Sequence, residues 1–308
     1  RFSYRKLSRE NRLTYDVLDY YLELSKKESD YLLYEEPMGT VSGVQTQIPV
    51  LLSEYQFQSK EDVDAYLELM KTTPDYFNSL IAFEQEKAQK GLFMASYTAD
   101  TVIEQCQAFI DMGDSNYLIS TFVDRIQKLT DLSESEKSDY IQKNAYMLKT
   151  YVLPAYQQLI KTVVELKDSG KNEEGLCYLP NGKEYYELTV QASTGSARTV
   201  PQLQKLTKNQ MKDDLAAMKA VIGLTAEQAK ETAVMESTDP KEILNSLSLD
   251  IQKTFPKLPQ TSVEVKYVPK AMEAHLSPAF YMIPALDDTE ENVIYVNQAQ
   301  MGNKLTLY

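Results

Sequence analysis

The stretch at residues 133–169, SESEKSDYIQKNAYMLKTYVLPAYQQLIKTVVELKDS, decides the fold class that we predict for this chain. Ser133 is a typical N-cap residue, and apolar residues then recur every three or four positions, which is the period of one face of an α-helix. The segment ends at Ser169-Gly170. Pro154 lacks a backbone N–H, so we expect it to kink this helix or to split it in two. The periodic residues are Ile141, Ala145, Leu148, Val152, Tyr156, Leu159 or Ile160, Val163 and Leu166.

The same period extends in both directions from this segment and predicts helices over most of residues 1–255. Ser59 is a helix N-cap, and Asp62 stands three residues later in the position of a capping box. Residues 35–58 interrupt the pattern with two prolines and two glycines, and we predict a loop there. An N-terminal helix carries an apolar stripe formed by Leu13, Val17, Tyr20, Tyr21 and Leu24.

The pattern changes after Pro256. Residues 263–268 alternate with a period of two, and residues 279–283 and 292–297 are also strand-like. We therefore predict a mainly α fold, with a body of about nine to eleven helices followed by a small strand-rich segment that starts a β-sheet. The predicted domains are a helical body, 1–258, and a strand-rich segment, 259–308, which we interpret as the start of a truncated catalytic region.

Composition excludes several classes of function. The formal net charge of −13 argues against nucleic acid, because phosphate binding needs a basic surface. No apolar run approaches the roughly 20 residues that span a bilayer. The chain begins with Arg1 and not with Met, so we expect that an upstream segment has been removed or left out. Cys106 lies on an apolar helical face and is predicted to be a core residue, while Cys177 lies in a Gly-rich turn, and a bridge between them is not favoured.

Local motifs give little support to catalysis. The chain has one histidine, His275, so a His-Glu-x-x-His zinc site is impossible within it. His275 stands in a polar connection between predicted strands and is interpreted as a loop residue, with a substrate-contacting role as the alternative. The acidic run at residues 287–291 is interpreted as a solvated hairpin loop and not as a calcium site. We assign no catalytic and no metal-binding residue.

Four residues are candidates for substrate binding: Tyr186, Tyr281, Tyr295 and Asn297. Tyrosine combines an apolar body with a polar tip, so it suits binding clefts and half-buried packing positions equally well. Asn297, at the end of a predicted strand, has a side chain that is able to bond the backbone of a peptide. It is equally suited to capping the segment that follows it.

An ordered set of stretches resembles the bacterial DUF885 family, from roughly Leu13 to the end of the chain. The resemblance implies a mostly helical body with a small sheet, similar to helical zinc metallopeptidases. It also implies a helix with a motif close to His-Glu-x-x-Pro-Gly-His shortly after the strand that ends at Asn297, and this chain contains no such motif. The stretches are Gln47–Leu52 with Tyr55–Leu67, Gly91–Met94 with Ala99–Cys106, Gly182–Leu188 with Thr194–Ser196, Tyr267–Lys270, Ser277–Tyr281 and Ile294–Asn297.

The resemblance leads to our first hypothesis. The chain would be the N-terminal part of a DUF885-like zinc-dependent peptidase, forming the cleft wall and the substrate-strand region and inactive alone. Zinc is expected only in the full-length protein, and the expected partners are the missing C-terminal part and a peptide substrate. The family resemblance further implies an exported, extracellular or cell-surface lipoprotein that touches the membrane only through a removed N-terminal anchor. The alternative is an extracellular helical module that binds peptides or cell-wall fragments without catalysis.

Overall fold

The computed structural model describes residues 3–41, 43–222, 237, 239–252, 255, 262–268, 273, 277–283 and 291–301. Contacts divide the chain into two compact units, Arg1–Asp213 and Asp214–Tyr308, which we describe separately. The predicted domain boundary between residues 258 and 259 marks the change from helical to strand-like patterning. The contact-based division lies earlier, so that helix α12 (Pro240–Ile251) belongs to the same unit as the strands.

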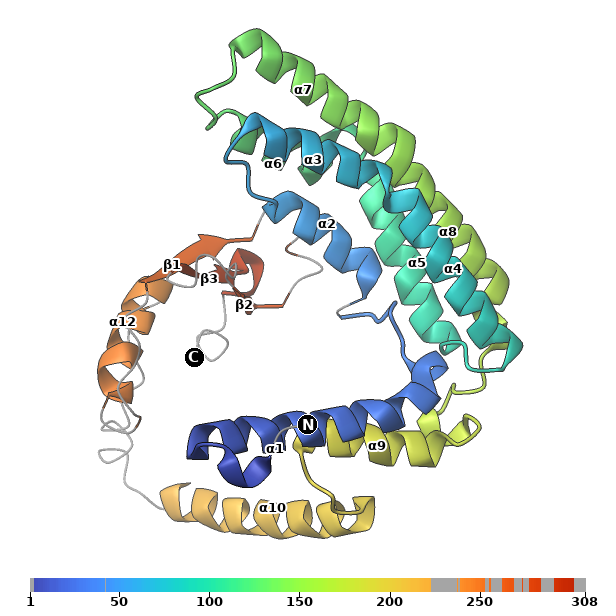
Figure 1. Cartoon of the computed structure of the whole chain (residues 1–308), viewed down its shortest axis with the longest axis vertical. Coiled ribbons are helices and arrows are strands. Elements are labelled where there is room, and N and C mark those ends of the chain that lie inside the picture. The colour runs from blue at the N-terminus through green and yellow to red at the C-terminus, as the bar shows by residue number, and fades with distance from the viewer. Residues whose placement is uncertain are drawn as a thin grey trace. The chain divides into compact units, whose positions relative to one another are not determined.

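The first unit is helical, as predicted, and α4, α5 and α8 lie side by side in it (Figure 1). Helix α10 continues across the boundary between the two units. Among the helices whose residues are described, none has the length and apolar character needed to cross a membrane. The α-helices are α1 (Arg9–Glu28), α2 (Val44–Glu54), α3 (Lys60–Lys71), α4 (Thr73–Gln89), α5 (Ser96–Asp111), α6 (Tyr117–Ile126), α7 (Glu134–Met147), α8 (Leu153–Leu166), α9 (Gly182–Thr194) and α10 (Val200–Ile222). Short 3₁₀ turns flank them, including η1 (Tyr4–Lys6), η2 (Ser29–Tyr34), η3 (Gly113–Ser115), η5 (Lys167–Ser169) and η6 (Leu176–Tyr178).

The long periodic segment is split in two, as Pro154 predicts. A π-helical turn, η4 (Leu148–Val152), separates α7 from α8, and Pro154 occupies the first turn of α8. The proline ring crowds the carbonyl one turn before it, and proline has no N–H to donate. The wider π-helical turn accommodates both the crowding and the missing hydrogen bond. Leu148, Val152 and Tyr156 are buried on the same side of the split helix, so the apolar stripe continues across it.

Part of the loop predicted at residues 35–58 is helical, so that prediction is wrong for α2. Pro49 lies inside this helix and leaves the carbonyl of Gln45 without its intrahelical donor. The hydroxyl of Tyr156, on α8, donates a hydrogen bond to that carbonyl at 2.7 Å. A side chain 111 residues away therefore supplies the bond that the proline removes, and local sequence patterns do not contain that information.

The two cysteines behave as predicted for unpaired residues. Both are free, with Cys106 buried and Cys177 exposed. Burial raises the pKa of the Cys106 thiol to about 12, so this group is a small core residue without nucleophilic character.

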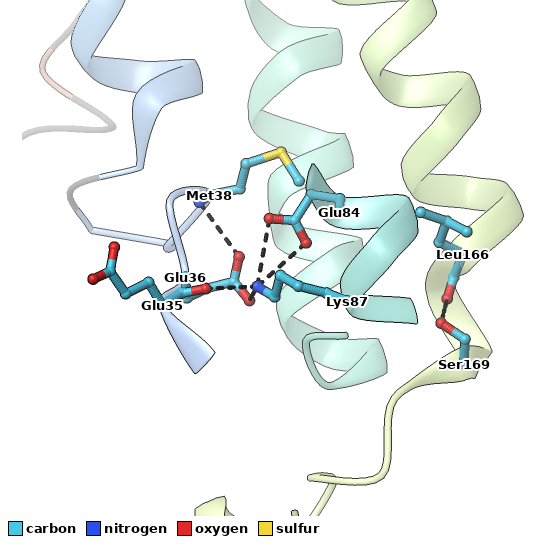
Figure 2. Close-up of polar contacts among 7 residues, drawn as sticks. All are labelled: Glu35, Glu36, Met38, Glu84, Lys87, Leu166 and Ser169. Carbon is cyan, nitrogen blue, oxygen red and sulfur yellow. Dashed lines mark hydrogen bonds and ion pairs between the residues drawn. The ribbon is translucent and has the colours of Figure 1, made fainter. Parts of the chain in front are cut away.

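A buried ion cluster attaches the segment between η2 and α2 to α4 (Figure 2). The side chains of Lys87 and Glu84 are each 1% exposed. Lys87 Nζ donates to the backbone carbonyl of Glu35 and to Glu36 Oε2, both at 2.8 Å. The two carboxyl oxygens of Glu84 lie farther from Nζ, at 3.3 and 3.4 Å. Burial, and next the charge of Glu36, raise the pKa of Glu84 to about 8 against the opposing effect of Lys87.

The second unit contains the predicted strands. Strands β1 (Ser262–Tyr267), β2 (Ala279–Met282) and β3 (Glu291–Val296) form a sheet of order β1-β3-β2. Strand β3 is parallel to β1 and antiparallel to β2, and the short turn η8 (Gln298–Gln300) follows it. The prediction of a helical body followed by a small sheet is therefore confirmed.

Candidate functional site

The register of the sheet decides which side chains share a face. Tyr281 on β2 stands opposite Ile294 on β3, which stands opposite Val265 on β1, so these three side chains lie on one face. Tyr295 pairs with Phe280 on the other face, where the two rings stack with centroids 5.0 Å apart and an interplanar angle of 8°. Tyr295 is buried and Tyr281 is 52% exposed. The structure therefore places these two candidates on opposite faces, and it leaves Tyr281 as the accessible one.

A polar chain crosses the three strands at one end of the sheet. The hydroxyl of Tyr281 donates to Asn292 Oδ1, and Asn292 Nδ2 donates to the carbonyl of Ser262 at 3.3 Å. These contacts hold the Tyr281 ring in a defined orientation at the surface. Asn292 is not among the binding residues predicted from the sequence. It stands in a strand-like stretch beside Val293, but only the register between β2 and β3 brings it close to Tyr281.

Asn297 is fully buried and uses both ends of its side chain within the chain. Its Nδ2 donates to the carbonyl of Glu273 at 2.8 Å, and its Oδ1 accepts from the backbone N–H of Ala299 at 3.2 Å. Asn297 therefore caps the short turn η8, which is the second of the two roles predicted for it. A direct contact with substrate stays a prediction.

Tyr186 belongs to the other unit, on α9, and is 47% exposed. Its chain neighbour Tyr185 stacks on Tyr31, with ring centroids 5.6 Å apart. The four candidates thus divide between the two units, one in the first and three in the second. His275 lies outside the residues that the structure describes.

Strand order determines where a further strand could be added. Strand β3 is paired on both sides, so a further strand cannot be added to it, whereas β2 lies at an edge of the described sheet. Among the described strands, β2 has only β3 as a neighbour. The N–H of Asn297 bonds the carbonyl of Pro278 at 2.8 Å, which makes residues 278, 280 and 282 the hydrogen-bonded positions of the antiparallel pair. The N–H and C=O groups of Ala279 and Tyr281 therefore point away from β3, toward the outer edge of β2.

A groove lies between α12 and β1, on the other side of the sheet from β2, with a volume of ≈ 760 Å³. Its lining combines apolar and polar residues in equal number. The apolar lining consists of Leu244, Leu247, Ile251, Val263 and Val265, and the polar lining of Lys241, Asn245, Ser248, Ser262 and Glu264.

The residues available here do not fit a zinc site. Within the described ranges, no three His, Cys, Asp or Glu side chains come together in a way that could hold a metal ion. Among the described residues, the arrangement offers the outer edge of β2 and the accessible Tyr281 on the same strand.

Comparisons with known proteins agree with the fold. The chain is similar to the putative lipoprotein from Colwellia psychrerythraea, whose crystal structure aligns with a TM-score of 0.71 at 18% identity. The alignment covers 88% of this chain and 52% of that one, so this chain spans about half the length of its structural neighbour. At this identity the likeness concerns the fold alone. No curated protein matches the chain. Residues 1–307 match the family described as bacterial protein of unknown function, DUF885, and the chain therefore belongs to the DUF885 family.

Proposed function

We propose that this chain is the N-terminal part of a zinc-dependent DUF885 peptidase, and that it supplies the cleft wall and the strand to which an extended peptide binds. The observation that carries the proposal is the outer edge of β2, where the backbone groups of Ala279 and Tyr281 point away from the sheet beside an accessible tyrosine ring. The family match supports it, as does the length of the structural neighbour, of which the alignment covers 52%.

Strand addition gives the edge a concrete role. An extended peptide laid along β2 would exchange hydrogen bonds with the N–H and C=O groups of Ala279 and Tyr281, each bond contributing about 0.5–1.5 kcal/mol. Because these contacts would be made to the peptide backbone, they would hold peptides of many different sequences. Selectivity would come from alternate side chains, one of which would lie against the Tyr281 ring.

Hydrolysis itself is not assigned to any described residue, because within the described ranges no group of three potential ligands could hold a metal ion. In the complete protein the metal would polarise the scissile carbonyl. This chain would contribute to the reaction by binding and aligning the peptide. A bound peptide would be held in a fixed orientation relative to the metal.

The gene beyond codon 308 provides the first test. A reading frame that continues into His-Glu-x-x-Pro-Gly-His within a few tens of residues supports the proposal. A natural stop codon directly after Tyr308 would count decisively against it. The full-length protein should then bind zinc and cleave a mixture of unstructured peptides, with the products identified by mass spectrometry.

The Colwellia protein's description supports a further part of the proposal, namely that the full-length protein is exported and anchored by lipid. Metabolic labelling of the expressing cells with radioactive palmitate and fractionation of the cells test this. Recovery of an unlabelled full-length protein in the cytosol would contradict it.

Substituting Ala279→Pro in the full-length protein should reduce kcat/KM for peptide cleavage by about tenfold, the equivalent of one lost hydrogen bond of about 1.4 kcal/mol. Proline removes the N–H at the outer edge of β2, while the ladder to β3 keeps its bonds because Ala279 is not a hydrogen-bonded position. The measurement is steady-state cleavage of one peptide taken from the product analysis.

The matched control is Ala279→Ser, which keeps the N–H and should leave kcat/KM unchanged. Wild-type kinetics in the proline variant would rule out strand addition at β2. Peptide binding by a full-length protein that holds no zinc and cleaves nothing would favour the binding module in place of the peptidase.

A further inference from the structure

Helix α1 exposes apolar side chains along most of its length. Leu13, Val17 and Tyr21 are 66%, 59% and 61% exposed, and Leu24 alone among the residues of this helix is buried. A surface helix of a globular protein ordinarily turns its apolar face toward a core. The sequence of α1 provides an apolar face of this kind, but the first unit buries little of it.

These residues form a continuous stripe. At 3.6 residues per turn, Leu13, Val17, Tyr20 and Leu24 follow one another on one side of the helix, with Tyr21 beside them. We call these five residues the α1 stripe. The buried end of the stripe, at Leu24, lies where α1 packs against η2 and α9. The exposed part therefore extends a packing surface that the first unit already uses.

Three acidic residues in the middle of the helix stand on another side. Asp16, Asp19 and Glu23 follow one another on a different side from the α1 stripe, and Asp16 accepts a hydrogen bond from the Tyr4 hydroxyl at 2.8 Å. A covering element would thus meet the apolar residues with these three carboxylates to one side of it. Covering a Leu, Val or Tyr side chain is worth about 1.5–3 kcal/mol, so the three most exposed members of the stripe together offer several kcal/mol.

The size of the stripe indicates which kind of partner covers it. A helix of 20 residues is about 30 Å long and about 10 Å across, so half of its lateral surface is roughly 500 Å². A stable complex between separate proteins needs about 800 Å² on each partner. The stripe is therefore too small to hold a second copy of the chain. It is sufficient for a segment of the same polypeptide, which is already present at high effective concentration.

We propose that the α1 stripe is the docking face for the part of a full-length DUF885 protein that lies outside these 308 residues. About half of the structural neighbour's chain has no counterpart in this one, so a longer protein of that kind contains further polypeptide that is available to cover the stripe. The inference rests on the proposed function in one respect, namely that the chain is one part of a longer protein. The occupant is expected to be a helix with an apolar face, because such a helix matches an exposed helical stripe.

Photo-crosslinking of the full-length protein tests the proposal. Tyr21 is replaced by p-benzoylphenylalanine, the purified monomer is irradiated, and the crosslinked peptides are identified by mass spectrometry. The expected result is a crosslink to a residue beyond 308. Crosslinks confined to residues 1–308, or crosslinks between two copies, would overturn the proposal. The same amino acid at Asp19, away from the stripe, is the control and should give no such crosslink.

Thiol reactivity gives a second measurement on the folded full-length protein. A cysteine at Val17→Cys should react with a maleimide at least about tenfold more slowly than one at Asp19→Cys, because only the first would be covered. Equal rates at the two positions would contradict the proposal. Both variants retain the exposed Cys177, whose labelling is separated by peptide mapping.

The two proposals fail in different ways. A full-length protein that crosslinks from Tyr21 to residues beyond 308 but cleaves no peptide would refute the peptidase and keep the docking face. An active peptidase with a freely reactive cysteine at position 17 would do the opposite.

Discussion

Replacing Lys87 by Met should lower the free energy of unfolding of the helical unit by about 3 kcal/mol, the lower end of the range for breaking a buried ion pair. Lys87 Nζ makes two bonds of 2.8 Å, to the carbonyl of Glu35 and the carboxylate of Glu36, and both lose their donor. The neighbouring Glu84, whose raised pKa keeps it largely protonated at pH 7, would also lose the longer hydrogen bond that Lys87 donates to it. Urea denaturation followed by far-UV circular dichroism at pH 7 measures the change.

Lys90→Met is the matched control for this prediction. Lys90 is the C-cap residue of the same helix, three positions after Lys87, and pairs with Glu86 at 2.9 Å, but the two side chains are 54% and 55% exposed. An exposed pair of this kind contributes about 0.3–0.5 kcal/mol. Equal losses in the two variants would show that burial of the cluster does not determine its contribution. The double variant Lys87→Met, Glu84→Met should recover part of the loss, because an apolar residue of similar size replaces a buried carboxyl that has lost its hydrogen-bond donor.

Raising the pH from 5 to 9 should destabilise the helical unit through Glu84, by an amount on the order of a few kcal/mol. The folded pKa of Glu84, about 8, lies above the ordinary value for a glutamate, so the folded state holds the proton more tightly than the unfolded state. The stabilising contribution of the neutral carboxyl is thus fully present below the ordinary pKa. It is lost progressively as the pH rises through about 8.

Glu84→Gln isolates this effect, since glutamine resembles the protonated carboxyl and does not titrate. At pH 5 the variant and the wild type should have similar stabilities, and at pH 9 the variant should be the more stable. Urea midpoints at pH 5, 7 and 9 provide the comparison. Glu86→Gln, at an exposed position on the same helix, should leave the pH profile of the wild type unchanged. A profile for Glu84→Gln that runs parallel to the wild type would refute the assignment.

The geometry of the cluster agrees with a neutral Glu84. The lysine lies 2.8 Å from a Glu36 oxygen but 3.3 Å or more from both oxygens of Glu84. A cation attracted equally by two carboxylates would have no reason to favour one of them. The pairing that holds residues 35 and 36 to α4 is therefore the one between Lys87 and Glu36.

Local features were predictable from local patterns. The capping box at Ser59 is present, since the backbone N–H groups of Gln58 and Ser59 donate to Asp62 at 2.9 and 2.8 Å and lower the pKa of its carboxyl. The break at Pro154 and the three strands were predictable as well. Each of these features depends on residues that are close to one another in the sequence.

The candidate site was predictable only in part. Tyr281 is accessible, as a binding residue has to be, whereas Tyr295 is buried in a stack with Phe280. The two tyrosines look alike in the sequence, because each stands in a short apolar strand. Their difference arises from the pairing of β2 with β3, which places one ring on each face of the sheet.

By itself the sequence determined the order and type of most elements, because helical and strand periods are properties of neighbouring residues. Only the tertiary structure decided that α2 continues through Pro49, that Lys87 is buried while Lys90 is not, and that β2 lies at an edge of the described sheet. Each of these depends on a segment far away in the chain: on Tyr156 for α2, on Glu36 for Lys87 and on β3 for β2. Whether a residue is buried, and which groups it bonds, depends on the segments that pack against it. Those segments are distant in the chain, so local sequence does not reveal them.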